Sequence, residues 1–351
     1  MRFVEINHLE EGMIVGKDII DLNGNLLLRA GVVLNDFYIE KLKEKNFNGI
    51  YIEDEISREI VPSEIIPQQL KFKMTKVFQL VSEGELSKDL CVEEVRKVII
   101  DVVEELIQSD AYLDVVLLKS LDEYLYSHSV NTTLISLLIG IEMGMTKNEL
   151  YNLGISALLH DIGKKFVRRE ILNKPGKLTE EEFEEIKLHP VWGYNHAREI
   201  GFSLLVCSGI IDHHEKYNGE GYPNRKKGEE ISLYGRIISI ADVYDALTST
   251  RTYRKAFPPH EAFEYVIGQG GIHFDKEIVN AFVHRVFPYP VGTIVRLSNG
   301  MVGIVVKNHR NFPLRPDVKV LKADDAFLDE PYVIELTRCL NITILNSLGN
   351  L

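Results

Sequence analysis

Cysteine is scarce in this chain: three residues, Cys91, Cys207 and Cys339, stand far apart among 351. An odd and dispersed set provides neither a disulfide framework nor a zinc-binding pattern. Buried free thiols are typical of proteins kept in a reducing compartment. The sequence therefore predicts a cytoplasmic protein that folds without disulfides.

Long hydrophobic runs are also missing. No apolar stretch approaches the ~20 residues that a helix needs to cross a bilayer. The first residues, Met1 to Glu5, do not open the long apolar segment of a signal peptide. We therefore expect no membrane partner and no export.

Positive charge is in the minority, with 40 lysines and arginines against 52 acidic residues and a formal net charge of -12. A general nucleic-acid binder needs a basic surface, so double-stranded nucleic acid is not an expected partner. A small anionic ligand stays compatible with this charge, because the local potential in a cleft decides its binding. Hydrophobic residues at 45% and charged residues at 26% are typical of a globular chain, here long enough for two or three domains.

Hydrophobic patterning divides the chain into a helical middle and two β-rich ends. Residues 1–55 alternate short β-branched runs with turn residues, and residues 56–119 pass from a proline-containing linker into helical periodicity. Residues 120–287 continue as helices broken by glycine- and proline-rich loops, and residues 288–351 return to short strand-like runs. The expected fold is multidomain, with an all-α core and a small β-rich module at each terminus. A homodimer formed through the helices of residues 68–120 is an alternative to a monomer.

Residues 213–223 carry the most informative motif, His-His-Glu-Lys-Tyr-Asn-Gly-Glu-Gly-Tyr-Pro. Adjacent imidazoles, with carboxylates nearby, suit divalent metals such as iron, manganese, zinc or nickel. Gly219 and Gly221 allow the backbone to lie close to a ligand where side chains would block it. Together with the His160-Asp161 pair upstream, the motif predicts a metal site beside a ligand-binding loop.

Further histidines and carboxylates lie on predicted helices beside apolar residues. The candidate metal ligands are, in chain order, His128, His160, Asp161, His189, His213, His214 and Asp242. A lone histidine in such a position more often fills a core. With each adjacent pair counted once, the seven residues form five sites within about 115 residues, and this number favours a shared cluster instead.

A cluster of this composition has a simple chemistry. The Asp161 carboxylate can bridge two metal ions ~3.5–4 Å apart, with histidines completing each coordination shell. A water held between the ions loses its proton near neutral pH and becomes a nucleophile. The ions also neutralise the charge that builds on phosphoryl oxygens during in-line attack. The residues therefore predict hydrolysis of a phosphate ester by metal-hydroxide attack.

Residues 120–285 resemble the HD-GYP family of cyclic-di-GMP phosphodiesterases, a branch of the HD-domain metal-dependent phosphohydrolases. The matching segments are His128, His160 to Lys164, His189-Pro190, His213 to Glu215, Gly219 to Pro223 and Asp242 to Arg254. The resemblance implies an all-helical core, a centre of two or three metals, and hydrolysis of cyclic-di-GMP to linear pGpG or onward to GMP. A weaker resemblance relates residues 1–55 to a β module that often precedes such domains.

The resemblance also implies roles for individual residues. The seven candidate ligands take the family's metal-binding positions. Asp161 and Lys164 are the implied catalytic residues, with Lys164 near the scissile phosphate. The implied substrate-binding residues are Arg251 and Arg254, which hold phosphate, and Gly221, Tyr222 and Pro223, in the loop that lines the guanine end.

Two positions depart from the family pattern. Members with a third metal carry a glutamate one helical turn before the first histidine, where this chain has Tyr124. A phenol is a poor ligand near neutral pH because its pKa is ~10, and Glu123 points about 100° away on the helix. We therefore expect two metals and pGpG as the end product, since complete conversion to GMP is linked to three metals. Asn218 replaces the family's usual aspartate and keeps its turn-forming chemistry.

Alternatives remain open at three points. Iron or manganese are the expected metals, with nickel or zinc as alternatives, because the donor atoms accept all of them. Another cyclic or linear dinucleotide is an alternative substrate. A receptor that binds cyclic-di-GMP without hydrolysing it is an alternative function, although the retained ligands and Lys164 favour an enzyme.

Three residues near the cluster complete the expectations. Asp245 is expected to hydrogen-bond a ligand histidine, as metal sites usually require, with capping or solvation as the alternative. His196 follows His189 by seven residues but lies outside the family pattern, so it is expected to be a surface or core residue. Trp192, the one tryptophan of the chain, is expected in the core.

Overall fold

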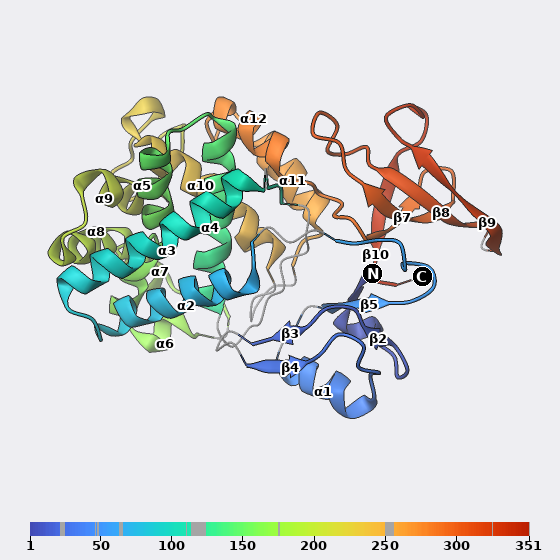
Figure 1. Cartoon of the computed structure of the whole chain (residues 1–351). Coiled ribbons are helices and arrows are strands. Elements are labelled where there is room, and N and C mark those ends of the chain that lie inside the picture. Colours follow the sequence, from blue (N-terminus) through green and yellow to red (C-terminus); the bar gives the residue numbers. More distant parts are fainter. Residues whose placement is uncertain are drawn as a thin grey trace.

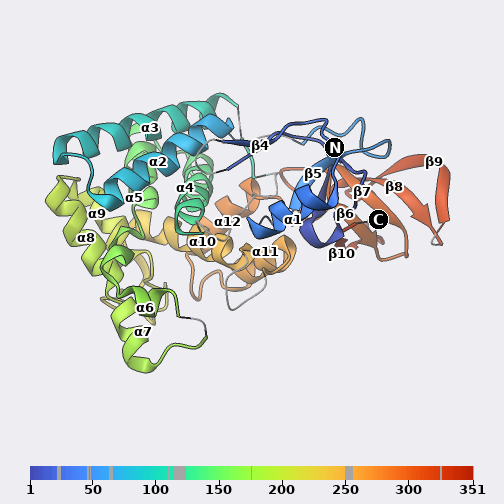
Figure 2. The same ribbon diagram turned by 90° about the horizontal axis from the view of Figure 1, so that it is seen from below.

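The computed structural model describes residues 1–21, 25–45, 47, 49–62, 66–109, 111–113, 124–174, 176–249, 256–324 and 326–350, with the backbone alone at Tyr124 and Leu125. A helical body occupies one side of the molecule, and two small β modules lie together on the other (Figures 1 and 2). This arrangement confirms the predicted fold class. None of the helices in the described part of the chain combines the length and the apolar character that a bilayer crossing requires.

The N-terminal module is a small antiparallel sheet with one helix. β1 (Arg2–Glu5) and β2 (Ile14–Val15) pair with opposite edges of β5 (Gly49–Glu53), and β3 (Ile19–Ile20) pairs with β4 (Leu26–Leu28). The 3-10 helix η1 (Ile6–His8) follows β1, and α1 (Asp36–Glu44) begins after Asn35, whose side chain accepts a hydrogen bond from the Tyr38 N–H. Residues 22–24, between β3 and β4, lie outside the described residues, and the two strands pair with each other.

Two long helices cover one face of the helical body (Figure 2). α2 (Gln68–Glu83) ends at Gly84, whose φ of 74° closes the helix in the left-handed conformation, and α3 (Lys88–Gln108) packs along α2. Their apolar residues, among them Phe78 on α2 and Ile99 on α3, are buried in the core of the body. The apolar faces of α2 and α3 are thus covered within the chain, so they are not available for a homodimer.

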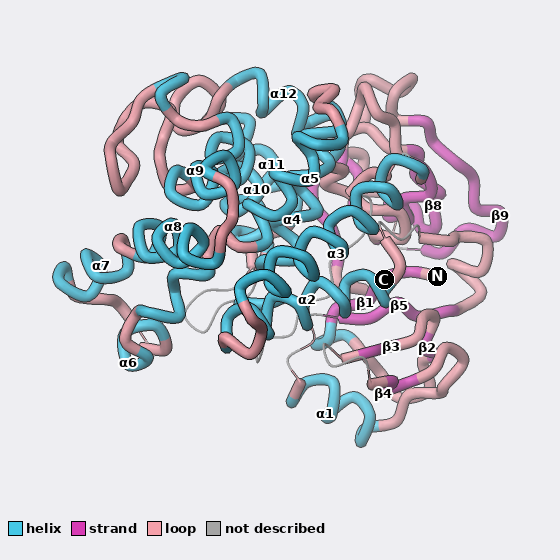
Figure 3. The backbone as a smooth tube through the Cα atoms, turned by 60° about the vertical axis from the view of Figure 1, so that its left-hand side comes forward, coloured by secondary structure: helices cyan, strands magenta, loops and turns pink. Residues whose placement is uncertain are grey.

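The third long helix, α4 (Tyr124–Glu142), is covered by several of the helices that follow it. Because α4 has no polar face, it is stable only where neighbours cover it, and residues 127–140 are all buried. The helices that follow α4 along the chain are α5 (Lys147–Leu158), η2 (Ile162–Phe166), α6 (Arg169–Leu172), α7 (Glu180–Ile186), α8 (His189–Ile200), α9 (Leu204–Asp212), η3 (Gly228–Glu230), α10 (Leu233–Thr248), α11 (Pro259–Gly268) and α12 (Lys276–Arg285) (Figure 3). Of these, α5, α10 and α12 make the main contacts with α4.

The C-terminal module is a five-stranded antiparallel sheet. Its strands are β6 (Ile294–Leu297), β7 (Val302–Lys307), β8 (Asp317–Ala323), β9 (Ala326–Glu335) and β10 (Ile344–Leu348), in the order β10-β6-β7-β8-β9. β6 and β7 form a hairpin whose turn contains Gly300, with a φ of 87°. Val295, Val305 and Val318 are fully buried in its core. The strand-like runs predicted near the C-terminus therefore form one sheet.

The two β modules contact each other through both ends of the chain, which lie side by side in Figure 1. The Glu5 N–H donates a hydrogen bond to Gly349 O at 3.4 Å, and the Arg2 guanidinium donates to Asn350 Oδ1 at 2.6 Å. Ile60, from the segment predicted as a linker, packs with apolar residues of the C-terminal sheet. Patterning along the chain did not predict this contact between the modules.

Glu142, at the end of α4, binds an arginine of the C-terminal module. Its Oε2 atom accepts hydrogen bonds from Arg285 Nε at 2.8 Å and from Arg310 Nη2 at 2.5 Å. Arg285 is buried and also donates to Ala111 O at 3.1 Å. Burial alone would raise the pKa of Glu142, but the hydrogen bonds from Arg310 and Arg285 outweigh burial and hold this pKa below its ordinary value.

We predict that Glu142→Gln lowers the free energy of unfolding near pH 7 by about 2 kcal/mol, because two charge-assisted hydrogen bonds lose their anionic acceptor. Since the native pKa of Glu142 is depressed, its contribution is present above the unfolded-state value of 4.5 and is lost as pH falls through the native pKa. The deficit of the variant should therefore shrink in acid. Urea unfolding across this pH range measures it, with the exposed Glu83→Gln as control. A deficit that stays constant with pH would contradict the charge effect.

Candidate metal centre

The His160-Asp161 pair lies in the tight turn between α5 and η2. Gly163, in η2, approaches α8 so closely that an added Cβ atom would lie 1.9 Å from His189 O and 2.6 Å from Gly193 N. Only glycine fits at this contact. The close approach of η2 to α8 brings the Asp161 carboxylate beside the His189 ring.

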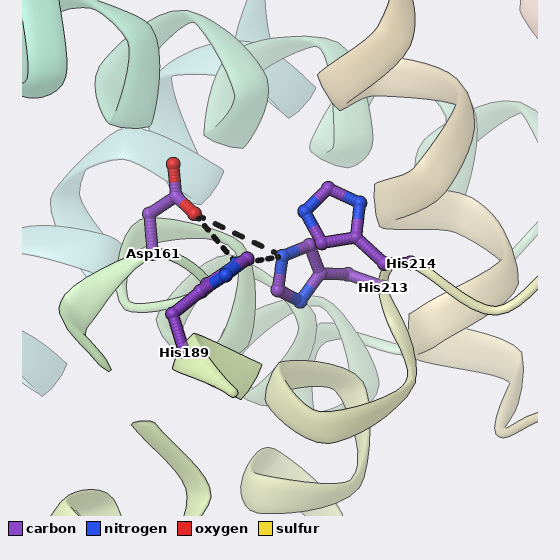
Figure 4. Close-up of side chains that lie close together, drawn as sticks. All are labelled: Asp161, His189, His213 and His214. Atoms are coloured by element: carbon purple, nitrogen blue, oxygen red, sulfur yellow. Dashed lines mark hydrogen bonds and ion pairs between the residues drawn. The ribbon is translucent and has the colours of Figure 1, made fainter. Parts of the chain in front are cut away.

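The other candidate ligands come from three further places in the fold. His128 lies on α4, His213 and His214 follow the end of α9, and Asp242 lies on α10. Figure 4 shows the side chains of Asp161, His189, His213 and His214 pointing toward one another. The structure brings all seven predicted ligands into one buried region, in which the His214 side chain is the most exposed, at 24%.

The donor atoms form two groups that share one carboxylate. One group consists of Asp161, His189, His213 and His214, and the other of His128, His160 and Asp161, with the donor atoms of each group within 4.8 Å of one another. Asp242 adjoins both groups. Its Oδ1 atom lies 3.0 Å from His128 Nε2, and its Oδ2 atom lies 3.7 Å from His214 Nδ1.

The two oxygens of Asp161 face different groups. Oδ1 lies 3.2 Å from His189 Nε2 and 3.9 Å from His213 Nε2. Oδ2 lies 3.4 Å from His160 Nε2 and 3.8 Å from His128 Nε2. A carboxylate placed in this way has the geometry to bridge two metal ions.

Backbone carbonyls fix the tautomer of three of the rings. The Nδ1 atom of His160 lies 2.8 Å from Ala157 O. The corresponding Nδ1 distances are 2.7 Å from His189 to Ile186 O and 2.7 Å from His213 to Ile210 O. Since a carbonyl only accepts hydrogen bonds, each Nδ1 carries the proton and each Nε2 turns a lone pair toward the cluster. This is the tautomer that binds a metal through Nε2.

The predicted hydrogen bond of Asp245 is present. His128 Nδ1 donates to Asp245 Oδ2 at 2.7 Å, and Asn131 Nδ2 donates to Asp245 Oδ1 at 3.0 Å. Burial alone would lower the pKa of His128, but its hydrogen bonds with Asp242 and Asp245 outweigh burial and raise the pKa to about 9. A metal that binds His128 Nε2 must therefore displace a proton.

Several buried nitrogen and oxygen atoms of the cluster have lone pairs that a bound cation would satisfy. His189 Nε2 and His213 Nε2 lie 3.2 Å apart, and in the tautomers above both present lone pairs. Within the described residues, His160 Nε2 and Asp161 Oδ1 are buried and form no hydrogen bond. Buried acceptors without partners are unfavourable. The donor set therefore fits divalent metal ions.

The shifted pKa values of His213, His214 and Asp161 also suit metal binding. Burial lowers the pKa of His214 to about 3, and burial with the neighbouring His214 and His160 rings holds the pKa of His213 well below its ordinary value. Burial alone would raise the pKa of Asp161, but the ammonium group of Lys164 and the neighbouring His160 ring hold this pKa well below its ordinary value. Neutral imidazoles and ionised carboxylates are the forms that coordinate metals.

Lys164 and the loop after His214 border the cluster. Lys164 Nζ donates to the shared carboxylate at 2.5 Å while its side chain stays 21% exposed. The Tyr222 ring lies against the His214 ring, with their centroids 4.8 Å apart. Gly221 and Pro223 flank Tyr222 in the same loop. The predicted catalytic lysine and the predicted guanine-lining loop thus both adjoin the metal-binding candidates.

Some predictions lie outside the described residues. Arg251, Arg254 and Glu123 belong to this group, so their predicted positions stay predictions. The backbone places Tyr124 at the start of α4, one turn before His128, but the structure does not describe its side chain. The expectation of two metals rather than three therefore rests on the sequence.

Three smaller expectations have mixed outcomes. Asn218 keeps its turn chemistry, since its Oδ1 atom accepts a hydrogen bond from the Glu220 N–H at 3.1 Å. His196 lies apart from the cluster, with its Nε2 atom 3.4 Å from Lys165 Nζ. The prediction for Trp192 is wrong, because this residue is only partly buried and lines a shallow surface pocket of about 250 Å³.

Sequence reasoning assigned no role to two buried carboxylates beside the site. Asp212 ends α9, and Glu215 follows the histidine pair; the two residues are 0% and 3% exposed. Both accept hydrogen bonds from the loop that contains Tyr222. The signal was available, since Asp212 directly follows an apolar helix and Glu215 belongs to the motif itself.

Parts of this chain are similar to known domains and proteins. Residues 115–278 match the model of the HD domain, and residues 294–349 match that of a KOW domain associated with the HD domain. Cyclic di-GMP phosphodiesterase PA4108 of Pseudomonas aeruginosa is 40% identical over 228 residues, which are 63% of this chain and 54% of the relative. Cyclic di-GMP phosphodiesterase PdeB of Borreliella burgdorferi is 30% identical over 203 residues, 58% of this chain and 54% of the relative. The chain thus spans about half the length of both relatives.

Two further proteins extend this comparison. The 3'3'-cGAMP-specific phosphodiesterase 2 of Vibrio cholerae is 36% identical over 144 residues, which are 40% of this chain and 28% of the relative. Among solved structures, the HDG"Y"P protein Bd1817 of Bdellovibrio bacteriovorus aligns over 80% of this chain and 97% of its own, with 16% identity and a TM-score of 0.48.

We predict that Asp245→Asn weakens metal binding by about 10- to 100-fold, because the His128 ring loses the anionic acceptor that orients it. Chelator competition followed by metal analysis measures the affinity. Asp101→Asn, the same change on the exposed side of α3, serves as control. Unchanged affinity in Asp245→Asn would show that the carboxylate does not support the site.

Proposed function

We propose, from the premise that this chain carries an HD domain, that it is a metal-dependent phosphodiesterase that hydrolyses cyclic-di-GMP to pGpG. The observation that carries the proposal is the pair of buried donor groups that share Asp161. Relatives named cyclic di-GMP phosphodiesterases, one of them 40% identical, support the choice of substrate. The location of Lys164 and Tyr222 beside the donor groups supports a site that both binds and cleaves a nucleotide phosphate.

Two divalent ions are proposed, iron or manganese, with nickel or zinc as alternatives. One ion would be held by His128, His160, Asp161 and Asp242, and the other by Asp161, His189, His213 and His214. When bound, the ions supply an ionised water as nucleophile and positive charge beside the phosphoryl oxygens. The separate orientation of the two Asp161 oxygens supports this division of ligands.

The side chains around the ions have their own tasks. Lys164 is partly exposed beside Asp161, so its ammonium group stabilises the negative charge that develops on the scissile phosphate. Tyr222 lies at the edge of the metal centre and receives the guanine end of the dinucleotide. The residues proposed to contact the substrate are Gly221, Tyr222, Pro223, Arg251 and Arg254.

A different cyclic dinucleotide is the second candidate substrate. The observation that favours it is the similarity to a 3'3'-cGAMP-specific phosphodiesterase, at 36% identity. Rates of hydrolysis of cyclic-di-GMP, 3'3'-cGAMP and a linear dinucleotide on one preparation separate these substrates. A protein loaded with each metal in turn that binds cyclic-di-GMP and never hydrolyses it would be a receptor instead.

Two further expectations stay predictions. The cytoplasmic location is tested by cell fractionation. A homodimer is tested by light scattering on the purified protein, and it would have to use a surface other than the buried apolar faces of α2 and α3.

The decisive experiment is metal analysis combined with turnover of cyclic-di-GMP by the wild type and by His160→Ala/Asp161→Ala. We expect about two metal ions per chain in the wild type and loss of both metal and turnover in the double variant, because Asp161 belongs to both donor groups. His196→Ala removes a histidine from α8 outside the cluster and should retain both. Full activity in the double variant would refute the proposed function.

A further prediction concerns the product. The wild type should accumulate pGpG, whereas Tyr124→Glu should bind a third ion and carry the reaction on to GMP. Tyr124→Phe, which removes only the hydroxyl group, should still stop at pGpG. Chromatography of the products with metal analysis measures this. Formation of GMP by the wild type at the rate of pGpG would contradict the predicted effect of Tyr124.

A further inference from the structure

Two buried carboxylates anchor the loop between α9 and α10. Asp212 accepts hydrogen bonds from Lys226 Nζ at 2.7 and 3.0 Å and from the Ser232 N–H at 2.9 Å. Glu215 accepts hydrogen bonds from the N–H groups of Asn224 at 2.7 Å and of Lys226 at 3.1 Å. Neither carboxylate belongs to the metal-binding groups. Their bonds hold the second half of the loop against its first half.

The anchored loop presents Tyr222 to the metal centre. An added Cβ atom on Gly221 would lie 2.3 Å from Lys216 N and 2.4 Å from Glu215 Cα, so the two halves of the loop touch through their backbones. The Tyr222 N–H donates to His214 O at 3.2 Å, and the tyrosine and histidine rings are in contact. The position of the Tyr222 ring is therefore set by how firmly the loop is closed.

We propose that Asp212, Glu215 and Lys226 are positioning residues, which hold Tyr222 in the orientation that receives one end of the dinucleotide. This inference rests on the proposed function. The ammonium group of Lys226 is engaged by Asp212 rather than offered to a phosphate. Its contribution to substrate binding is thus indirect, through the loop.

The energetics favour a loop that is closed before the substrate arrives. The Asp212 side chain is fully buried, and a buried carboxylate without its cation is strongly unfavourable. Glu215 satisfies two backbone N–H groups of the loop at once. Because the loop is already ordered, substrate binding does not have to supply the free energy for ordering it. A variant with a looser loop should therefore bind the substrate more weakly.

The test uses Lys226→Met, which keeps the length of the side chain and removes its charge. We expect KM for cyclic-di-GMP to rise about tenfold with kcat changed less than about twofold and metal content unchanged. Lys226→Arg should restore most of the affinity. Lys227→Met, the same change at the next and exposed position, should behave as wild type. Asp212→Asn/Lys226→Met should be less impaired than Lys226→Met, because no buried charge is left without a partner.

A double-mutant cycle separates positioning of Tyr222 from general stability. In a Tyr222→Ala background, Lys226→Met should leave KM unchanged, although it lowers the midpoint of urea unfolding as much as it does in the wild type. An equal rise of KM in both backgrounds would overturn the proposal, since the loop would then not act through Tyr222. An unchanged KM in the wild-type background would overturn it as well.

Binding of pGpG to the metal-loaded protein is measured by calorimetry. It distinguishes failure of the positioning proposal from failure of the proposed function. A wild type that binds pGpG and does not hydrolyse cyclic-di-GMP refutes the function, and the same cycle can then be read from Kd. A wild type that neither binds nor hydrolyses these nucleotides overturns both.

Discussion

The buried carboxylate of Asp161 is the constraint on which the arrangement of the helical body depends. A carboxylate that is 1% exposed needs positive charge or hydrogen bonds around it. Imidazoles from α4, from α8 and from the ends of α5 and α9 surround it, and Lys164 donates to it from η2. The contacts of α4 with α10 and of η2 with α8 therefore serve the polar site as well as the apolar core.

Helix ends explain how so many rings share one tautomer. His160, His189 and His213 each follow the last residues of a helix, α5, α7 or α9, and each bonds a carbonyl three residues earlier. The last carbonyls of a helix have no partner within it, so they are available as acceptors. They also carry the negative end of the helix dipole. Three helix C-termini thus both orient the Nε2 lone pairs and favour a cation at the point where the rings meet.

The ligands could be predicted from the sequence, because histidines and carboxylates that recur in order beside apolar residues are typical of a shared metal site. The residues that hold the site in shape could not. Asp212 and Lys226 are 14 residues apart and meet only when the loop closes. The bond between Glu5 and Gly349 joins opposite ends of the chain, which no local pattern can indicate. Trp192 was placed in the core by composition alone, whereas one side of α8 faces solvent.

The same long-range contacts decide how the β modules relate to the site. α4 carries His128 near its start and Glu142 at its end, 14 residues apart or about 21 Å along the helix axis. Glu142 binds Arg310 of the C-terminal module, and that module is bonded in turn to the N-terminal one through Arg2 and Asn350. The modules are therefore fastened to the helix that supplies one of the candidate ligands. Function still resides in the site rather than in this architecture, since the donor groups around Asp161, and not the fold, determine which chemistry is available.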